Sequence, residues 1–191
     1  MLSGWDGQQA HGWGASRVDS GKLGRSSAAP VQELVVRCGL GDMVSDGVGE
    51  VKIELGRRYR FAAAHRLHSA GLSDAENSRL YGKCNNPLGH GHNYVVEISV
   101  SGNVDPATGM IANLADLDGF VQREVLDAFD HRSLNDDVPV FRTEVPTTEN
   151  LCIEIFRRVR SFPLAKLERV RVEETANNSF EYAGDDVRGD S

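Results

Sequence analysis

Apolar and polar residues alternate along two long runs in the middle of the chain. The first run extends from Val51 to His65 and predicts a half-buried strand with a bulge near Gly56. The second run begins at His90, and its apolar parity carries His92, Tyr94, Val96, Ile98 and Val100. Because alternate side chains of a strand face the same way, His65, His90 and His92 are all expected at strand ends, on the buried face.

Three segments have helical signals. Apolar residues form one stripe from Asn113 to about Phe129. A second helix is expected behind the hydroxyl cap of Thr147 and should end at Pro163. Between the two long strands, in a stretch without sustained periodicity, Ser73 could cap one or two further helical turns.

Two short strands are predicted near the end of the chain. In the first, the parity that buries Val170 and Val172 also carries Glu174 inward, and the second runs from about Ser179 to Tyr182. The element order is therefore ββααββ. Antiparallel pairing within each hairpin predicts an α+β fold with two helices on one face of a small sheet. The other face and the sheet edges would then be covered by association with other copies.

The two ends of the chain have a different composition. The first fifty of the 191 residues hold ten of the twenty glycines and lack a sustained apolar period. We expect residues 1–50 to form a largely disordered, glycine-rich extension, in which the segment from Val31 to Arg37 predicts a short strand. Residues 51–184 are expected to form one domain, and residues 185–191 a polar tail.

Charge and cysteine content narrow the class of function. A net charge of −7 and a pI near 5.4 argue against a general nucleic-acid binder. No apolar run is long enough for a membrane span, and the N-terminus lacks a signal-peptide pattern. The three cysteines, Cys38, Cys84 and Cys152, are too few and odd in number for a disulfide framework. A cytoplasmic location is expected.

The three strand-end histidines suggest a metal site. A lone inward histidine is more often a hydrogen-bonded core residue. An H-x-H pair on one strand face, joined by a third histidine from a neighbouring strand, matches the three protein ligands of catalytic zinc, which keeps one position for substrate. His65, His90 and His92 are therefore candidate ligands.

Cys84 has several interpretations. It could be a fourth ligand that closes a structural site, a base or nucleophile just outside the ligand set, or a loop cysteine without a task. A cation and an imidazole nearby would lower its pKa. Asp130 and His131, at the end of a predicted helix, could polarise the thiol as in a catalytic triad, or could be a polar helix end with a favourable dipole contact.

Glu174 is the third signal, because a buried carboxylate is costly unless it is paired. The amino-pyrimidinone edge of a pterin or a guanine offers two adjacent N–H donors that would satisfy it. The alternative partner is a buried arginine, for which Arg58 or Arg60 could serve.

Six motifs, in order and with matching spacing, resemble the 6-pyruvoyl-tetrahydropterin synthase family. The resemblance covers about residues 56–184. The motifs are F-A-A-A-H-R-L-H from Phe61, Y-G-K-C-N-N-P-L-G-H-G-H-N-Y from Tyr81, D-P-A-T-G-M from Asp105, L-D-A-F-D-H-R-S-L-N from Leu126, P-T-T-E-N from Pro146 and V-E-E-T-A-N-N from Val172.

The resemblance implies a T-fold, whose subunits associate into barrels and commonly into a homohexamer with active sites at subunit interfaces. It implies zinc held by His65, His90 and His92, with Cys84 as the proton-abstracting base. Asp130 and His131 would complete the triad, either within one subunit or across a subunit interface.

The resemblance also implies a pterin site and a reaction. Glu174 matches the residue that anchors the pterin ring, and Thr147, Thr148 and Glu149 match the segment that lines its pocket. The implied enzyme is a lyase that eliminates triphosphate from 7,8-dihydroneopterin triphosphate and redistributes hydrogens to give 6-pyruvoyl-tetrahydropterin, on the route to tetrahydrobiopterin. By position, Arg66 and Lys83 are candidates for binding the triphosphate, with Mg2+ as its candidate companion.

Two alternatives stay open. The related 6-carboxy-tetrahydropterin synthases of the queuosine pathway start from the same substrate and share the Cys, H-x-H and Asp-His elements. The segments T-T-E-N and E-T-A-N-N resemble the pyruvoyl branch more closely. An alternative of another class is a structural zinc module with Cys84 as fourth ligand and no catalysis.

Overall fold

The computed structural model describes the backbone of residues 33–38 and residues 52–184. The expected disordered extension and polar tail, apart from the segment 33–38, lie outside the described residues. Within the described part of the chain, no helix is long and apolar enough to cross a membrane.

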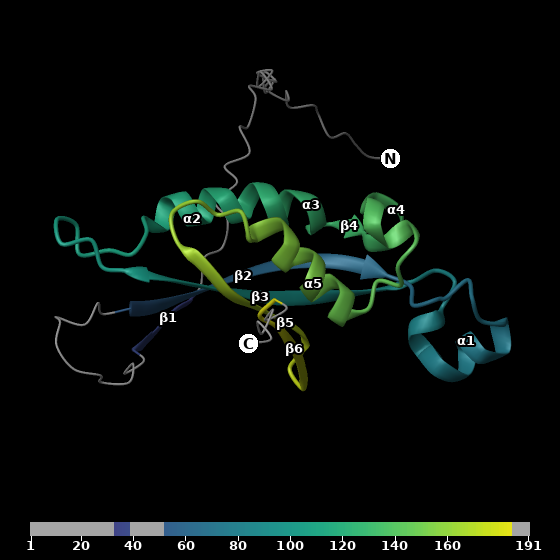
Figure 1. The fold of residues 1–191 in the computed structure, drawn as a ribbon. Coiled ribbons are helices and arrows are strands. Elements are labelled where there is room, and N and C mark those ends of the chain that lie inside the picture. Colours follow the sequence, from purple (N-terminus) through teal and green to yellow (C-terminus); the bar gives the residue numbers. More distant parts are fainter. Residues whose placement is uncertain (1–32, 39–51, 185–191) are drawn as a thin grey trace, which may run out of the picture.

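One antiparallel sheet forms the base of the fold, with the strand order β1-β2-β3-β5-β6 (Figure 1). The alternating runs predicted from the sequence become its two central, longest strands. A short strand, β4, pairs in parallel with the end of β2. The strands are β1 Glu33–Cys38, β2 Lys52–His65, β3 His90–Asn103, β4 Arg132–Ser133, β5 Lys166–Thr175 and β6 Asn178–Tyr182.

The predicted bulge near Gly56 is wrong. Gly56 pairs opposite Ser99 of β3 on one side and opposite Val35 of β1 on the other, and both registers continue unbroken. An extra residue at this point would have to disturb two ladders at once. The irregularities lie instead in the pairing of β3 with β5, beside Ser99, and in that of β5 with β6, beside Glu173.

The predicted first long helix is confirmed, with one feature that the periodicity did not reveal. Asn113 caps α2, Leu114–Val121, by accepting a hydrogen bond from the Ala115 amide. The chain continues through a π-helical turn, η2, Gln122–Leu126, into α3, Asp127–Phe129. Val125 and Leu126, in the π turn, are buried in the core.

The second long helix, α5, spans Thr148–Val159 behind the predicted Thr147 cap. The helix ends at Val159, four residues before Pro163. The predicted end at Pro163 is therefore wrong, because the helix has already ended before the proline. Ser73 caps α1, Asp74–Tyr81, through a capping box with Glu76. Three short helical segments complete the fold: η1 Gly82–Asn85, α4 Leu134–Asp137 and η3 Pro139–Arg142.

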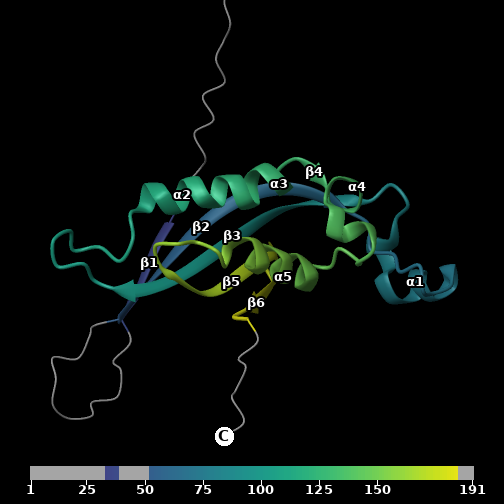
Figure 2. The same cartoon turned by 45° about the horizontal axis from the view of Figure 1, so that its top comes forward.

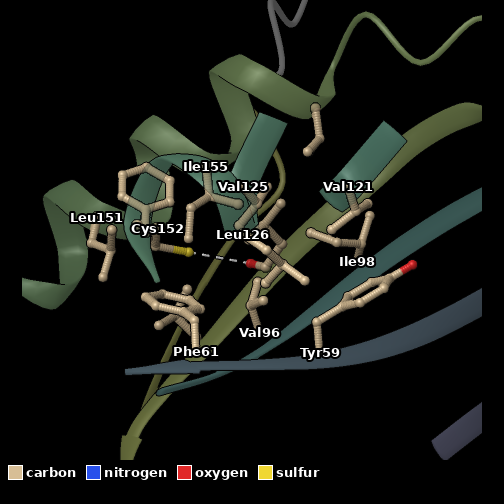
Figure 3. Close-up of a cluster of buried hydrophobic side chains, with 14 of the residues drawn as sticks. Tyr59, Phe61, Val96, Ile98, Val121, Val125, Leu126, Leu151, Cys152 and Ile155 are labelled. Carbon is tan, nitrogen blue, oxygen red and sulfur yellow. Dashed lines mark hydrogen bonds between the residues drawn. The ribbon is translucent and has the colours of Figure 1, made fainter. Parts of the chain in front are cut away.

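The hydrophobic core lies between the sheet and the two long helical segments, which cover the same face (Figures 1 and 2). Figure 3 shows side chains of α2, η2 and α5 pointing toward those of β2 and β3. The Cys152 thiol donates to the Val170 carbonyl at 3.3 Å and is thus a buried core group. The predicted α+β layout, with helices on one face of an antiparallel sheet, is confirmed.

Candidate functional site

Strand register brings the three histidines together. His65, the last residue of β2, lies opposite His90, the first residue of β3, and His92 lies opposite Ala63. Since all three belong to the parity that faces the helices, their rings meet where the two strands end, beside the N-terminus of α5. The ring centroids of the three pairs are 4.7, 5.1 and 4.7 Å apart.

The nitrogen atoms of this cluster have the arrangement that a metal needs. His65 Nε2 lies 3.2 Å from His90 Nε2, and one nitrogen of each of the three rings lies within 4.8 Å of the others. His65 Nδ1 donates to the Pro146 carbonyl at 2.8 Å, which leaves the Nε2 lone pair directed at the cluster. His92 Nε2 is buried and has no hydrogen-bond partner among the described residues. The three residues therefore fit a metal ion.

Burial also favours the ligand form of two of these residues. It lowers the pKa of His65, and the neighbouring charges of His90 and His92 lower it further. The pKa of His90 is lowered by burial and by His92. A neutral imidazole is the form that binds metal. The lowered pKa values therefore keep His65 and His90 in the metal-binding form at neutral pH.

Glu174 lies near the end of β5. Its side chain points inward, toward the histidine cluster, as the sequence predicted. Its Oε1 accepts from the Thr148 hydroxyl at 2.7 Å, and its Oε2 accepts from Asn178 Nδ2 at 2.9 Å. Burial alone would raise the pKa of Glu174, but these hydrogen bonds outweigh it and the pKa is lowered. The carboxylate therefore stays ionised.

The alternative partner proposed for Glu174 is wrong. Arg58 pairs instead with Glu173, at 3.0 Å. The physical reason is parity, since Arg58 and Glu173 both face away from the helices while Glu174 faces toward them. Thr148 and Asn178, and not an arginine, hold the half-buried carboxylate.

Cys84 lies in η1, whose backbone is tied to the end of β2 because the Leu67 amide donates to the Cys84 carbonyl at 2.9 Å. Among the described residues, the metal-capable group consists of the three histidines and does not include this cysteine. In the metal-free chain, partial burial and the charge of Glu174 raise the pKa of the Cys84 thiol. The lowered pKa expected from the sequence thus requires the charge of a bound cation.

Asp130 and His131 follow α3 and form a pair, with His131 Nδ1 3.0 Å from Asp130 Oδ1. The same carboxylate oxygen accepts from the Ala62 amide at 2.9 Å, and His131 has a positive φ of 57°. The imidazole is 83% exposed. Within the described part of the chain, no hydrogen bond or ion pair connects this pair to Cys84.

The predicted Thr147–Glu149 segment forms the start of α5. Thr147 is the N-cap and accepts from the Asn150 amide at 3.3 Å. Thr148 is buried and holds Glu174, whereas Glu149 is exposed in the first turn. Of the three, Thr148 has direct contact with the centre of the site.

Arg66 and Lys83 line one cavity of about 640 Å³ beside η1. Arg66 also lines a second cavity, of about 550 Å³, that reaches His65. The Arg66 guanidinium donates to the carbonyl and side-chain oxygens of Asn85, each at 3.3 Å. Because these acceptors are neutral, they do not neutralise the positive charge of Arg66.

Sequence reasoning missed two asparagines that hold functional residues in place. Asn178 supports Glu174, and Asn135 clamps the backbone of Arg66, accepting from its amide at 2.8 Å and donating to its carbonyl at 3.0 Å. Both lie inside the motifs quoted above. Their signal was an amide side chain in a predicted loop or turn, where asparagine often bonds to nearby backbone.

Comparison with known proteins agrees with this geometry. Residues 54–185 match the family model described as 6-pyruvoyl tetrahydropterin synthase. The chain is 46% identical to the 6-pyruvoyl tetrahydrobiopterin synthase of Homo sapiens over 145 residues, which are 75% of this chain and all of that protein. It is 45% identical to the Drosophila melanogaster protein of the same name over 133 residues, 68% of this chain and 79% of that protein.

A solved structure shows the same fold with high identity. The 6-pyruvoyl tetrahydropterin synthase of Caenorhabditis elegans superposes with a TM-score of 0.67 at 46% identity, covering 70% of this chain and 96% of that one. The range matched by the family model includes every candidate site residue, the helices and the sheet apart from β1 and the first two residues of β2. The chain belongs to the 6-pyruvoyl tetrahydropterin synthase family.

Proposed function

We propose that the protein is a zinc-dependent lyase that converts 7,8-dihydroneopterin triphosphate to 6-pyruvoyl-tetrahydropterin, in tetrahydrobiopterin biosynthesis. The observation that carries this proposal is the placement of an ionised, donor-supported carboxylate, Glu174, beside a three-histidine cluster. In this arrangement the carboxylate would hold the pterin ring, and the neighbouring metal would hold the side chain of the same substrate.

His65, His90 and His92 would hold the ion. Three imidazoles suit several divalent metals, and zinc is our assignment because its catalytic sites combine three protein ligands with one open position. A zinc ion there would act as a Lewis acid on the hydroxyls of the substrate side chain and make the adjacent C–H more acidic. The Pro146 carbonyl orients His65 for this task.

Cys84 is the proposed base. Its thiolate would take a proton from the substrate side chain, and the released electron pair would form a C=C bond as the C–O bond to triphosphate breaks. Later hydrogen shifts within the substrate need no external oxidant. Asp130 would orient His131, and His131 would polarise the thiol. Since His131 is exposed, and no hydrogen bond or ion pair joins it to Cys84 within the described residues, we assign its partner thiol to a neighbouring subunit.

Glu174 is the proposed pterin anchor. Each carboxylate oxygen keeps a lone pair beyond those used by Thr148 and Asn178, so two adjacent pterin N–H groups could donate to it. Thr147, Thr148 and Glu149 would line the pocket at the start of α5. This arrangement leaves the side chain of the substrate directed toward the histidines.

Arg66 and Lys83 are proposed to bind the triphosphate. Their support is a shared cavity and, for Arg66, a second cavity that reaches His65. A guanidinium and an ammonium would stabilise the leaving group as its charge develops, with Mg2+ as a candidate companion.

We further propose that residues 51–184 form the T-fold domain, with residues 1–50 as an extension and 185–191 as a tail. The assembly would be a homohexamer with barrels built from the sheets. Ion pairs on the sheet face opposite the helices, Arg169–Glu54 and Arg58–Glu173, support a polar barrel interior. A cytoplasmic location is proposed from the sparse, odd set of cysteines.

The deciding experiment is incubation of the purified, zinc-loaded protein with 7,8-dihydroneopterin triphosphate. We expect release of inorganic triphosphate and a pterin with the mass of 6-pyruvoyl-tetrahydropterin. A 6-carboxy product accompanied by acetaldehyde would assign the protein to the carboxy branch. A protein that binds zinc and leaves the substrate intact would be a structural module.

A further inference from the structure

Tyr94 is a buried residue of β3 that lies next to the histidine cluster and has no part in the reaction proposed above. It follows His92 by two residues and therefore faces the helices, on the same side of the sheet. The ring of Phe61, opposite it on β2, stacks against it with the two centroids 5.2 Å apart. A tyrosine hydroxyl that is withdrawn from water needs partners within the protein.

One partner of this hydroxyl is the candidate metal ligand His65. The Tyr94 hydroxyl oxygen lies 3.4 Å from His65 Nδ1, and the Pro146 carbonyl oxygen lies 2.8 Å from the same nitrogen. When Nε2 of His65 faces a metal, Nδ1 carries the ring proton and is a donor. This N–H group then donates to the carbonyl and, through a longer second branch, to the Tyr94 oxygen. The hydroxyl proton of Tyr94 is thereby left for another acceptor.

The second partner is Thr148, whose side chain is in hydrogen-bonding contact with the Tyr94 hydroxyl. A threonine hydroxyl has one proton and two acceptor sites. Thr148 directs its proton to Glu174 Oε1, at 2.7 Å. Tyr94 is therefore the donor in its contact with Thr148.

These contacts form one chain of hydrogen bonds that runs in a single direction, from His65 through Tyr94 and Thr148 to Glu174. The first three members are 2%, 0% and 3% exposed, so water does not compete for their bonds. Hydrogen bonds in such a chain polarise one another. With a cation at Nε2, the Nδ1–H group of His65 becomes a stronger donor, and each later bond up to the carboxylate is strengthened with it.

We propose that Tyr94 is a positioning residue that couples the metal site to the pterin site. Its hydroxyl orients His65 on one side and, through Thr148, orients Glu174 on the other. This inference rests on the proposed function, since it takes His65 as a metal ligand and Glu174 as the pterin anchor. It adds a residue that acts on both sites from behind them, without contact with the substrate.

The test is Tyr94→Phe, which keeps the ring and removes only the hydroxyl. Zinc affinity is measured on the pterin-free protein by competition with a chromophoric chelator. Pterin affinity is measured on the zinc-free protein with 6-methyl-7,8-dihydropterin, which has the ring but no side-chain hydroxyls. We expect both affinities to fall about three- to tenfold, as for the loss of one hydrogen bond. A loss in only one of them, or in neither, would overturn the coupling.

Tyr59→Phe is the matched control. Tyr59 is a second buried tyrosine on the helix-facing side of the sheet, and its hydroxyl donates to Asp118 at 2.8 Å. Its removal should leave both affinities unchanged. If Tyr59→Phe weakens both as much as Tyr94→Phe does, the effect is a general loosening of the core and the inference falls.

A double-mutant cycle with Thr148→Val tests the link through Thr148. Because the two hydroxyls act on Glu174 in series, Tyr94→Phe should not weaken pterin binding further once residue 148 is valine. Equal losses in the two backgrounds would overturn the series.

A further measurement does not depend on the folding of any variant. In a neutron structure of the zinc-loaded, unmodified protein, the hydroxyl deuteron of Tyr94 should point to Thr148, and the deuteron on His65 Nδ1 should lie between Pro146 and Tyr94. A Tyr94 deuteron that points to His65 would reverse the chain and overturn the inference.

The outcomes separate this inference from the proposed function. If the 6-pyruvoyl product forms and Tyr94→Phe leaves both affinities unchanged, the proposed function stands and the coupling falls. If Tyr94→Phe lowers both affinities and the unmodified protein forms no 6-pyruvoyl product, the coupling stands and the proposed reaction falls.

Discussion

The Thr148 hydroxyl donates to Glu174 Oε1 over 2.7 Å and thereby joins the first turn of α5 to the end of β5. The contact links a residue in the predicted helix start to a residue in a predicted strand, 26 positions apart. Through it, the position of a helix fixes the orientation of the carboxylate at the centre of the site.

Thr148→Val should weaken pterin binding with little effect on the fold, because valine keeps the shape of threonine and removes the donor. Loss of one hydrogen bond to a charged group corresponds to about 1.5 to 3 kcal/mol, or roughly 10- to 150-fold in affinity. Binding of 7,8-dihydroneopterin can be followed by its fluorescence. Unchanged affinity would show that Asn178 alone positions Glu174.

Cys84→Ala and His131→Ala should each abolish most triphosphate release while retaining the metal. If the two residues meet across an interface, as proposed, mixed oligomers of the two variants will contain some sites with both native residues. Co-refolding the inactive variants should then restore part of the activity, up to about a quarter for random pairing. A mixture that stays inactive, despite verified subunit exchange, would place the two residues in the same subunit.

Asp118→Ala should destabilise the domain. Asp118 on α2 accepts from Arg57 at 3.0 and 2.7 Å and from the Tyr59 hydroxyl at 2.8 Å, so its loss leaves two largely buried donors without their acceptor. We expect a decrease of about 2 to 4 kcal/mol in the free energy of unfolding, measured with urea. Asp116→Ala, an exposed change in the first turn of the same helix, is the control and should cost far less.

Glu168 should make stability depend on pH in the acid range. Burial opposes ionisation, but hydrogen bonds from Ser101, Lys52 and Lys166 outweigh it and lower the pKa of Glu168 from 4.5 to about 2. A lowered pKa in the folded state stabilises the protein above the unfolded value, and this contribution is lost as the pH falls from about 4.5 toward about 2. Its size is about 2 kcal/mol after allowance for the exposed lysines.

Glu168→Gln should remove this part of the pH dependence. The difference in unfolding free energy between the unmodified protein and the variant should be largest at neutral pH and should shrink below pH 4.5. A difference that stays constant from pH 7 to 3 would contradict the assignment.

Periodicity predicted the parts of the site that depend on local geometry. His65, His90, His92 and Glu174 were expected on one face because strands alternate with a period of two, and the structure places all four there. The helix caps predicted at Ser73 and Thr147 are confirmed, since a side-chain oxygen just before a helix accepts from the free amides of its first turn.

Features that depend on contacts between distant segments were not predictable in this way. Nothing in the local pattern around Arg57 indicates Asp118, which lies 61 positions away. The π turn of η2 and the end of α5 at Val159 also have no sign in the local pattern. Within the described residues, no hydrogen bond or ion pair joins His131 to Cys84, and nothing in the local pattern around either residue indicates this.

His65 lies directly opposite His90 in the β2–β3 ladder, and His92 follows two residues later. A slip of one residue during hairpin formation would turn the histidines of one strand to the other face. Only the native register can then capture the ion, and binding free energy adds to the stability of that register alone. Metal uptake would therefore favour correctly paired β2–β3 hairpins while the chain folds.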